Sequence, residues 1–257
     1  EAHKEPINRL NVYPVPDGDT GTNMYLTVGS VIEELEGVES EDRQAVCEAI
    51  SHGSLMGARG NSGVILSQVL RGMSDCFSRS ENIDSELLTE ALTESSISAD
   101  GAVMKPVEGT ILTVVRESAR SAMKAKQSGS ITAVIEEALA GGEIALEKTP
   151  EQLEVLREAG VVDAGGAGFL LLLNAFLHVL DGRDLPSPPD VSQVANATDN
   201  SPGESQIADL RYEVMYLLNA PDEAMDEFKR VWAGLGDSIV VVGGDGLWNC
   251  HIHTDDI

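Results

Sequence analysis

The sequence predicts an all-helical bundle or barrel, followed by a smaller and incomplete α/β domain. Apolar residues recur at helical spacing through residue 180, for example at Leu66, Val69, Leu70 and Met73. No stretch of this region shows a sustained alternation of apolar and polar residues, which is the pattern of a half-buried strand. Proline and glycine then gather among polar residues from 182 to 206, and strand-like alternation begins only after them.

The apolar stripes of the first part predict roughly seven or eight helices, joined by short glycine-containing loops. Each helix has one apolar face to bury against its neighbours. The longest apolar run, 169–180, is too short to span a bilayer and contains Asn174 and His178, so we expect a buried helix without membrane insertion. The other stripes lie at 24–35, 66–77, 87–92, 111–122 and 131–139.

We place the helical domain at 1–181, a linker at 182–206 and the second domain at 207–257. In the second domain, alternation predicts strands at 212–218, 238–242 and 247–253, and helical spacing predicts a helix at 222–232. The chain begins without methionine, and its last strand comes early for a self-contained sheet. We therefore expect the natural protein to be longer.

Acidic side chains dominate the composition, with 43 Asp and Glu against 17 Lys and Arg and a formal net charge of −26. Such a charge repels nucleic acid and anionic lipid headgroups, so we exclude both as partners. An anionic ligand would need a bound metal and oriented backbone N–H groups rather than a cluster of lysines. The three cysteines form no CxxC pair, which argues against a disulfide framework and indicates a reducing, cytoplasmic location.

Glycine-rich polar loops stand directly before amphipathic helices at four places. The start of a helix presents unpaired N–H groups, and glycine lets a phosphate approach the backbone closely. Together the loops could cradle a polyphosphate, although each could equally be an ordinary helix cap that contributes ~1 kcal/mol. The sequence has neither the GxxxxGK[ST] pattern of a P-loop nor a Rossmann GxGxxG. The loops are 17–23, 57–63, 108–110 and 163–168.

Two carboxylates, Asp17 and Asp19, stand two residues apart in a turn that Pro14 and Pro16 make rigid. The turn is not an EF-hand, because its sixth position lacks glycine and its twelfth lacks glutamate. The pair suits Mg²⁺, which takes one or two carboxylates and completes its shell with water and substrate phosphates. An isolated Asp-Gly-Asp is also common in surface turns, so the neighbouring residues must decide between the two interpretations.

The string NVYPVPDGDTGTNM at 11–24, the 57–63 loop and DAGG at 163–166 resemble the nucleotide-binding L domain of the dihydroxyacetone kinase superfamily (DhaL type). Within this superfamily, the sequence most resembles the nucleotide-binding A subunit of bacterial fatty-acid kinase. Residues 211–213, 236–243 and 251–254 resemble the middle domain of that component, so the resemblance covers nearly the whole chain. It implies a barrel of antiparallel helices, with Mg²⁺-ATP lying across the loops at one end.

This resemblance also implies a role for individual residues. Asp17 and Asp19 would be the catalytic pair that holds the Mg²⁺ bridging the phosphates. Asn11 stands near the position of a third aspartate in the family, so it is either a neutral third ligand or a turn residue. The residues implied to contact the nucleotide are Thr20, Gly21, Thr22, Asn23, Asn61, Ser62, Gly109, Thr110, Asp163 and Gly165.

The activity that the resemblance implies is transfer of the γ-phosphoryl group of ATP to a fatty-acid carboxylate, which gives an acyl phosphate. A separate fatty-acid-binding, DegV-like partner protein would present the acid, and we leave a homodimer open. A carboxylate is already ionised near neutral pH and needs no general base. The alternatives are the L component of a dihydroxyacetone (glycerone)-type kinase, a nucleotide-binding regulatory module without turnover, and a helical lipid-binding shell whose loops are only caps.

A second metal site is suggested by His251 and His253, which alternate along a predicted strand and therefore point to one face. In the middle domain of the family, a cysteine on an earlier strand joins such a pair in binding zinc. Glu213 stands in the place of that cysteine here, so the site would combine two imidazoles with a carboxylate, or would hold no zinc. Cys250 points to the opposite face, and we predict that it lies in the core.

Overall fold

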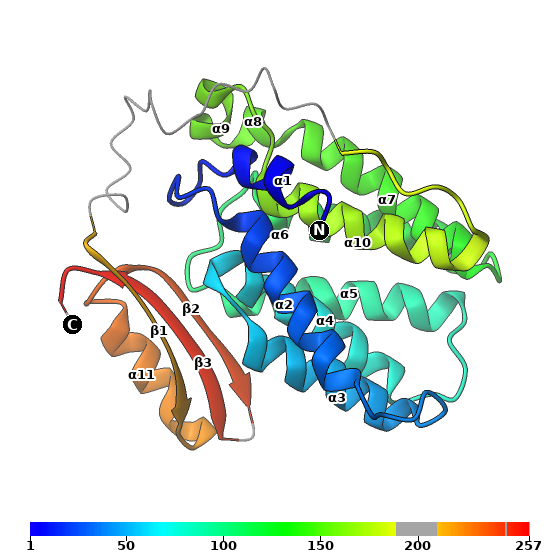
Figure 1. The fold of residues 1–257 in the computed structure, drawn as a ribbon, viewed down its shortest axis with the longest axis horizontal. Coiled ribbons are helices and arrows are strands. Elements are labelled where there is room, and N and C mark those ends of the chain that lie inside the picture. The colour runs from blue at the N-terminus through cyan, green and yellow to red at the C-terminus, as the bar shows by residue number, and fades with distance from the viewer. Residues whose placement is uncertain (189–209, 245, 257) are drawn as a thin grey trace.

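The computed structural model describes residues 1–188, 210–244 and 246–256. Within these ranges a helical part leads into a small antiparallel sheet that carries one further α-helix, α11 (Figure 1). The predicted fold class, an all-α domain followed by a smaller α/β part, is confirmed. Of the predicted linker at 182–206, only 182–188 falls within the described residues, so the domain boundary stays a prediction.

The helical part has ten α-helices among the described residues up to 188, more than the seven or eight predicted. Seven of them are long, and six of these coincide with the apolar stripes, whereas α3 was not singled out by a stripe. The other three, α1, α8 and α9, have 7, 4 and 6 residues, too few for a periodic stripe to show in the sequence. The ten are α1 (Lys4–Leu10), α2 (Thr20–Leu35), α3 (Arg43–Gly57), α4 (Gly60–Phe77), α5 (Ser85–Ala102), α6 (Ile111–Ala122), α7 (Ile131–Glu147), α8 (Thr149–Gln152), α9 (Glu154–Ala159) and α10 (Ala164–Asp181).

The long helices form a closed ring. Each contacts the next along the chain from α2 to α7, and α10 packs against α7 and returns to α2. The centre of the ring is filled by aliphatic side chains, because burying the apolar stripe of each helix is the main source of stability. Several of these side chains are completely shielded from solvent, among them Val69, Val114, Val134, Leu173 and Leu177.

Helix α10 extends beyond the 169–180 run to 18 residues, and by length and composition alone it is long and apolar enough to cross a membrane, which the run by itself is not. It also contacts α1, α2, α6 and α7, and Phe169 and Leu173 on its inner face are almost fully buried. The same features are expected of a helix at the centre of a bundle. Its apolar composition is therefore explained by the core that it completes.

The second part contains the strands β1 (Tyr212–Asn219), β2 (Asp237–Gly244) and β3 (Leu247–Thr254), and the helix α11 (Met225–Trp232). These elements lie where alternation and helical spacing predict them. The strand order is β1-β3-β2, and both pairs are antiparallel. One face of the sheet packs against α11 through a cluster that includes Trp232, Val241 and Cys250, so the predicted core position of Cys250 agrees with the structure.

The opposite face of the sheet lies against the helical part. Val240 and Val242 of β2 pack with Val64 of α4 and with residues at the ends of α3 and α5. Figure 1 shows the sheet between α11 and the helices. The segment after α5 extends this contact, because Val103 forms an antiparallel bridge with Val240. The two parts therefore share one apolar interface, and β2 is the strand nearest to the helices.

Candidate functional site

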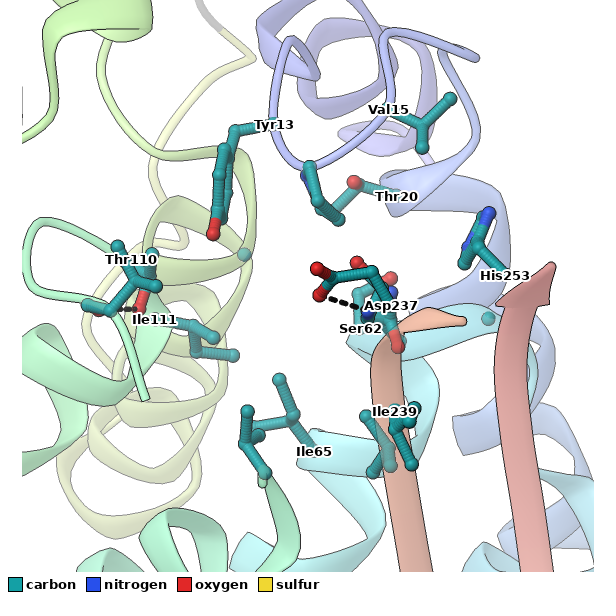
Figure 2. A pocket seen from close by; sticks show the side chains of 18 of the residues that line it. Tyr13, Val15, Thr20, Ser62, Ile65, Thr110, Ile111, Asp237, Ile239 and His253 are labelled. Carbon is teal, nitrogen blue, oxygen red and sulfur yellow. Dashed lines mark hydrogen bonds between the residues drawn. The ribbon is translucent and has the colours of Figure 1, made fainter. Parts of the chain in front are cut away.

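A cavity of about 350 Å³ lies where several helix N-termini meet the sheet. Its walls come from the 11–19 loop, the first turns of α2, α4, α6 and α10, the 103–107 segment, and the strands. Figure 2 shows Tyr13 of the 11–19 loop around the same space as Asp237 and His253, which lie on the neighbouring strands β2 and β3. The cavity therefore joins residues of both parts of the chain.

The predicted metal residues lie together on one wall. Asn11, Asp17 and Asp19 all line the cavity, and the Asn11 amide nitrogen donates to Asp17 Oδ1 at 2.5 Å. Burial and the neighbouring Asp19 carboxylate raise the pKa of Asp17 to about 7. Two carboxylates that are costly to ionise side by side match the demand of a hard divalent cation for oxygen ligands. Asn11 orients Asp17, and its amide oxygen is the atom that could complete the metal's protein ligands.

Much of the predicted loop sequence is already helical. Helix α2 begins at Thr20, α4 at Gly60 and α10 at Ala164, so the polar residues lie in first turns, where backbone N–H groups have no helical partner. Four of them, Thr20, Asn23, Asn61 and Ser62, line the cavity, and their contacts with phosphate or ribose stay a prediction. Among the described residues, the Asn61 Oδ1 atom is buried without a hydrogen-bond partner, so it can accept from a ligand group or an ordered water.

Gly60 lies at a close contact between α4 and α2. Its φ of +53° lies in the left-handed region, and a Cβ at this position would lie 2.3 Å from Asn23 Nδ2. Only glycine lets Asn23 keep its place in the wall of the cavity. The local reason for a glycine here is thus the placement of a predicted ligand residue.

Three predicted contact residues, Gly21, Thr22 and Gly109, do not line the cavity. The Thr22 N–H donates to Asn8 Oδ1 of α1 at 3.0 Å, so this N–H is not free to bind a phosphate. A Cβ on Gly21 would lie 2.2 Å from the Lys4 carbonyl oxygen, so this glycine permits close packing against α1. Gly109 faces α8 and its N–H donates to the Thr113 hydroxyl at 3.0 Å. These residues therefore pack the elements around the cavity against one another and do not face its interior.

Asp163, Gly165 and Thr110, the other predicted nucleotide residues, line the far wall of the cavity. The Asp163 carboxylate caps α10 by accepting the Gly166 N–H at 2.6 Å, and backbone N–H groups of Gly165 and Ile111 also favour its ionised form. Burial is the larger effect and raises its pKa to about 6. Asp163 therefore holds the N-termini of α6 and α10 together, and the Thr110 hydroxyl is engaged by the Val107 carbonyl at 2.7 Å.

Several cavity residues have no local sequence signal. Asp237 and Ser238 enter from the sheet, and Lys105 enters from the segment after α5. Ser238 has a φ of 50°, rare for a residue other than glycine, beside an irregularity in the pairing of β2. Tyr13 adjoins the predicted metal loop, and its pKa is raised by burial and by the charges of Asp237 and Asp163. Only the 11–24 string could have singled out Tyr13.

A second candidate metal centre adjoins the cavity. Ligand atoms of Glu213, His251 and His253 lie within 4.8 Å of one another. Both His251 ring nitrogens are buried without a hydrogen-bond partner among the described residues, and Nδ1 lies 3.5 Å from the Glu213 Oε1 atom. Burial lowers the pKa of His251 to about 3 and also lowers that of His253, so both imidazoles are neutral, as metal ligation requires. Glu213 and His253 also line the cavity, whereas His251 lies behind it.

Comparison with known proteins bears on both parts of the chain. Residues 14–178 match the model of the DAK2 domain, and residues 209–257 match that of the FakA-like middle domain of fatty acid kinase. Protein YloV of Bacillus subtilis (strain 168) is 40% identical over 262 residues, which cover 97% of this chain and 47% of YloV. Uncharacterized proteins of Staphylococcus haemolyticus and Staphylococcus aureus (strain USA300) are each 39% identical over 259 residues, with the same coverage. The chain thus spans about half the length of these relatives.

Proposed function

The chain belongs to the DAK2-domain family and carries a FakA-like middle domain, and from this membership we propose that it is the ATP-binding component of a fatty-acid kinase. The observation that carries the proposal is the Asp17 and Asp19 pair, which lines a cavity bounded by the first turns of α2 and α4 and in which the pKa of Asp17 is raised to about 7. That arrangement places oxygen ligands for a metal beside backbone N–H groups suited to phosphates.

In this proposal the phosphates of ATP lie between the metal loop and the helix N-termini. Asp17 and Asp19 hold Mg²⁺, which when bound offsets the charge of the phosphates. Asn11 fixes Asp17 through its amide, and the unpaired Asn61 oxygen, an acceptor, is available to a donor such as a ribose hydroxyl or a metal-bound water. Gly60 provides the room in which Asn23 stands.

The acceptor is a fatty-acid carboxylate presented by a separate fatty-acid-binding, DegV-like partner. One carboxylate oxygen attacks the γ-phosphorus in line, and the bond from that phosphorus to the bridging oxygen breaks. ADP leaves with the electron pair of that bond, and the product is an acyl phosphate. Because the carboxylate is already ionised, the transfer requires no proton abstraction, and the task of the chain is positioning and charge stabilisation.

We also propose that the Glu213, His251 and His253 cluster binds Zn²⁺. The support is geometric, since two neutral imidazoles and a carboxylate converge, and one imidazole is buried with both nitrogens unpaired. Three protein ligands leave a coordination position for water or another group. The cluster would fasten β1 to β3 beside the wall that both strands give to the cavity.

The decisive experiment is an acyl-phosphate assay with the full-length protein, a fatty-acid-loaded partner and Mg²⁺-ATP. Asp17→Asn and Asp19→Asn should each abolish product, whereas Asp226→Asn, on the exposed side of α11, should leave the rate unchanged. Isothermal titration with Mg²⁺-ATP separates the alternatives. Absence of binding at millimolar nucleotide would refute the kinase and the nucleotide-regulated module together, and would leave the lipid-binding shell.

Binding without turnover on any fatty-acid-loaded partner would favour the regulatory module. Product with dihydroxyacetone in place of the fatty acid would favour the glycerone-type kinase, in which case the same helical site serves a different acceptor. Each outcome is read from the same protein preparation, so the alternatives are compared under one set of conditions.

A further inference from the structure

The cavity is strongly acidic for a site that would receive a polyphosphate. Five carboxylates line it, those of Asp17, Asp19, Asp163, Glu213 and Asp237. Among the described lining residues, the one lysine or arginine is Lys105. Because no second lysine or arginine among the described residues shares the lining, the charge of Lys105 has a large effect on the electrostatic potential in the cavity.

Lys105 is held in reach of the cavity by the interface between the two parts. The preceding residues are tied to β2, since Val103 pairs with Val240 and the Met104 N–H donates to the Ile239 carbonyl at 3.4 Å. The Lys105 side chain is 70% exposed, so its ammonium group is free to change partners without unpacking the core. The backbone of Lys105 is thus held by β2, whereas its ammonium group can move.

The present partner of Lys105 is Asp237 of the other part, with Nζ and Oδ2 separated by 3.4 Å. Asp237 is itself held in the wall, because its Oδ1 accepts the Ser238 N–H at 2.7 Å. In the sheet Asp237 is paired with His253, which lines the same cavity. The ion pair therefore links the segment after α5 to β2 beside the cavity, and Figure 2 shows Asp237 among the side chains that surround this space.

We propose that Lys105 is a phosphate-binding residue that leaves Asp237 to pair with the terminal phosphate of bound Mg²⁺-ATP. The assignment rests on the proposed function and adds to it a residue and a competing carboxylate. A terminal phosphate carries more negative charge than a carboxylate and offers three oxygens, so it is the stronger partner for an ammonium group. Asp237 then restrains Lys105 in the empty site and is displaced when nucleotide enters.

The competing explanation is that the pair is only a clamp between the two parts. The two explanations differ in the sign of the Asp237 effect. If Lys105 is a phosphate ligand, removing the charge of Asp237 frees the ammonium group and strengthens ATP binding. If the pair is a clamp, removing either partner weakens the closed arrangement, and both substitutions reduce binding together.

Titration of the full-length protein with Mg²⁺-ATP and Mg²⁺-ADP tests the assignment. Lys105→Ala should weaken ATP binding by about fivefold to tenfold and ADP binding by less than about twofold, because ADP lacks the terminal phosphate. The matched control is Lys124→Ala. Lys124 is 67% exposed and 3.5 Å from Glu137, so it has the same kind of partner, but it does not line the cavity, and its removal should leave both affinities unchanged.

A double-mutant cycle separates direct competition from a general change in charge. Asp237→Asn should strengthen ATP binding in the parent protein and give no such gain in the Lys105→Ala background. Equal losses for ATP and ADP, or a gain from Asp237→Asn that persists without Lys105, would overturn the assignment. If the parent protein and Lys105→Ala bind Mg²⁺-ATP equally well, the role of Lys105 is refuted and the proposed function stands. Parent protein that binds no Mg²⁺-ATP refutes the proposed function and this assignment with it.

Discussion

Replacing Gly60 by alanine tests whether the approach of α4 to α2 sets the geometry of the site. The new Cβ would lie 2.3 Å from Asn23 Nδ2, well inside van der Waals contact. The backbone there has a φ of +53°, which an alanine adopts only with strain. Gly60→Ala therefore combines backbone strain with a steric clash against Asn23. A second glycine with positive φ allows the two contributions to the free energy of unfolding to be measured separately.

Gly37 is the matched control, because its φ is +89° and a Cβ there would meet nothing within 4 Å. Its replacement by alanine incurs only the backbone cost of about 1 kcal/mol. Gly60→Ala incurs a similar backbone cost and in addition must displace the Asn23 amide, the far end of a side chain, so the added cost falls at the low end of the overpacking range, about 1 kcal/mol. We expect Gly60→Ala to lower the free energy of unfolding by about 2 kcal/mol and Gly37→Ala by about 1 kcal/mol.

Urea unfolding followed by circular dichroism at 222 nm gives both free energies, and titration with Mg²⁺-ATP gives the effect on the site. Gly60→Ala should weaken nucleotide binding, since the displaced Asn23 lines the cavity, whereas Gly37→Ala should not. If Gly60→Ala proved as mild as Gly37→Ala and bound nucleotide as the parent protein does, the close approach would not hold Asn23 in place, and our account of this wall would fail.

The remaining predictions concern stability, pH and metal. Leu173→Ala, at a fully buried position of α10, should cost about 2–5 kcal/mol in urea unfolding, whereas Val179→Ala on the same helix, where the side chain is 82% exposed, should cost less than about 0.5 kcal/mol. Burial raises the pKa of Asp163 from 3.8 to about 6, so the stability that its proton confers is complete below about pH 4 and is lost as the pH rises through 6. Asp163→Asn should remove this decrease of about 3 kcal/mol in the free energy of unfolding. If the free energy of unfolding of Asp163→Asn fell between pH 4 and 7 as steeply as that of the parent protein, the pH dependence would not come from Asp163. His251→Ala should abolish zinc retained after dialysis, as measured by mass spectrometry of the metal, and a parent protein that retains no zinc would refute the site.

The sequence alone determined the fold class and the two carboxylates of the candidate metal site. Helical spacing and strand alternation depend on the order of neighbouring residues, so they are visible without any tertiary information. The same is true of the Asp17 and Asp19 pair, whose two-residue spacing within a rigid turn limits how far the carboxylates can separate. The family membership that the 11–24 string implied is confirmed by the match of residues 14–178 to the DAK2 domain.

Tertiary structure decided which of the candidate residues face the cavity. Thr20 and Thr22 lie in the same helical turn, yet Thr20 lines the cavity and Thr22 is bound by Asn8 of α1. Successive residues of a helix point about 100° apart, and the neighbour that each one meets is set by packing that no local pattern records.

The residues that the sheet contributes to the cavity are likewise placed there by the tertiary fold. Lys105 and Asp237 form an ion pair although 132 residues separate them. Their meeting depends on Val103 pairing with Val240 and on the apolar contact between β2 and α4. The sequence by itself determined the carboxylates that would hold a metal, because their spacing is local. Only the packing of the sheet on the helices decided which charges surround those carboxylates, because that packing joins segments that are distant along the chain.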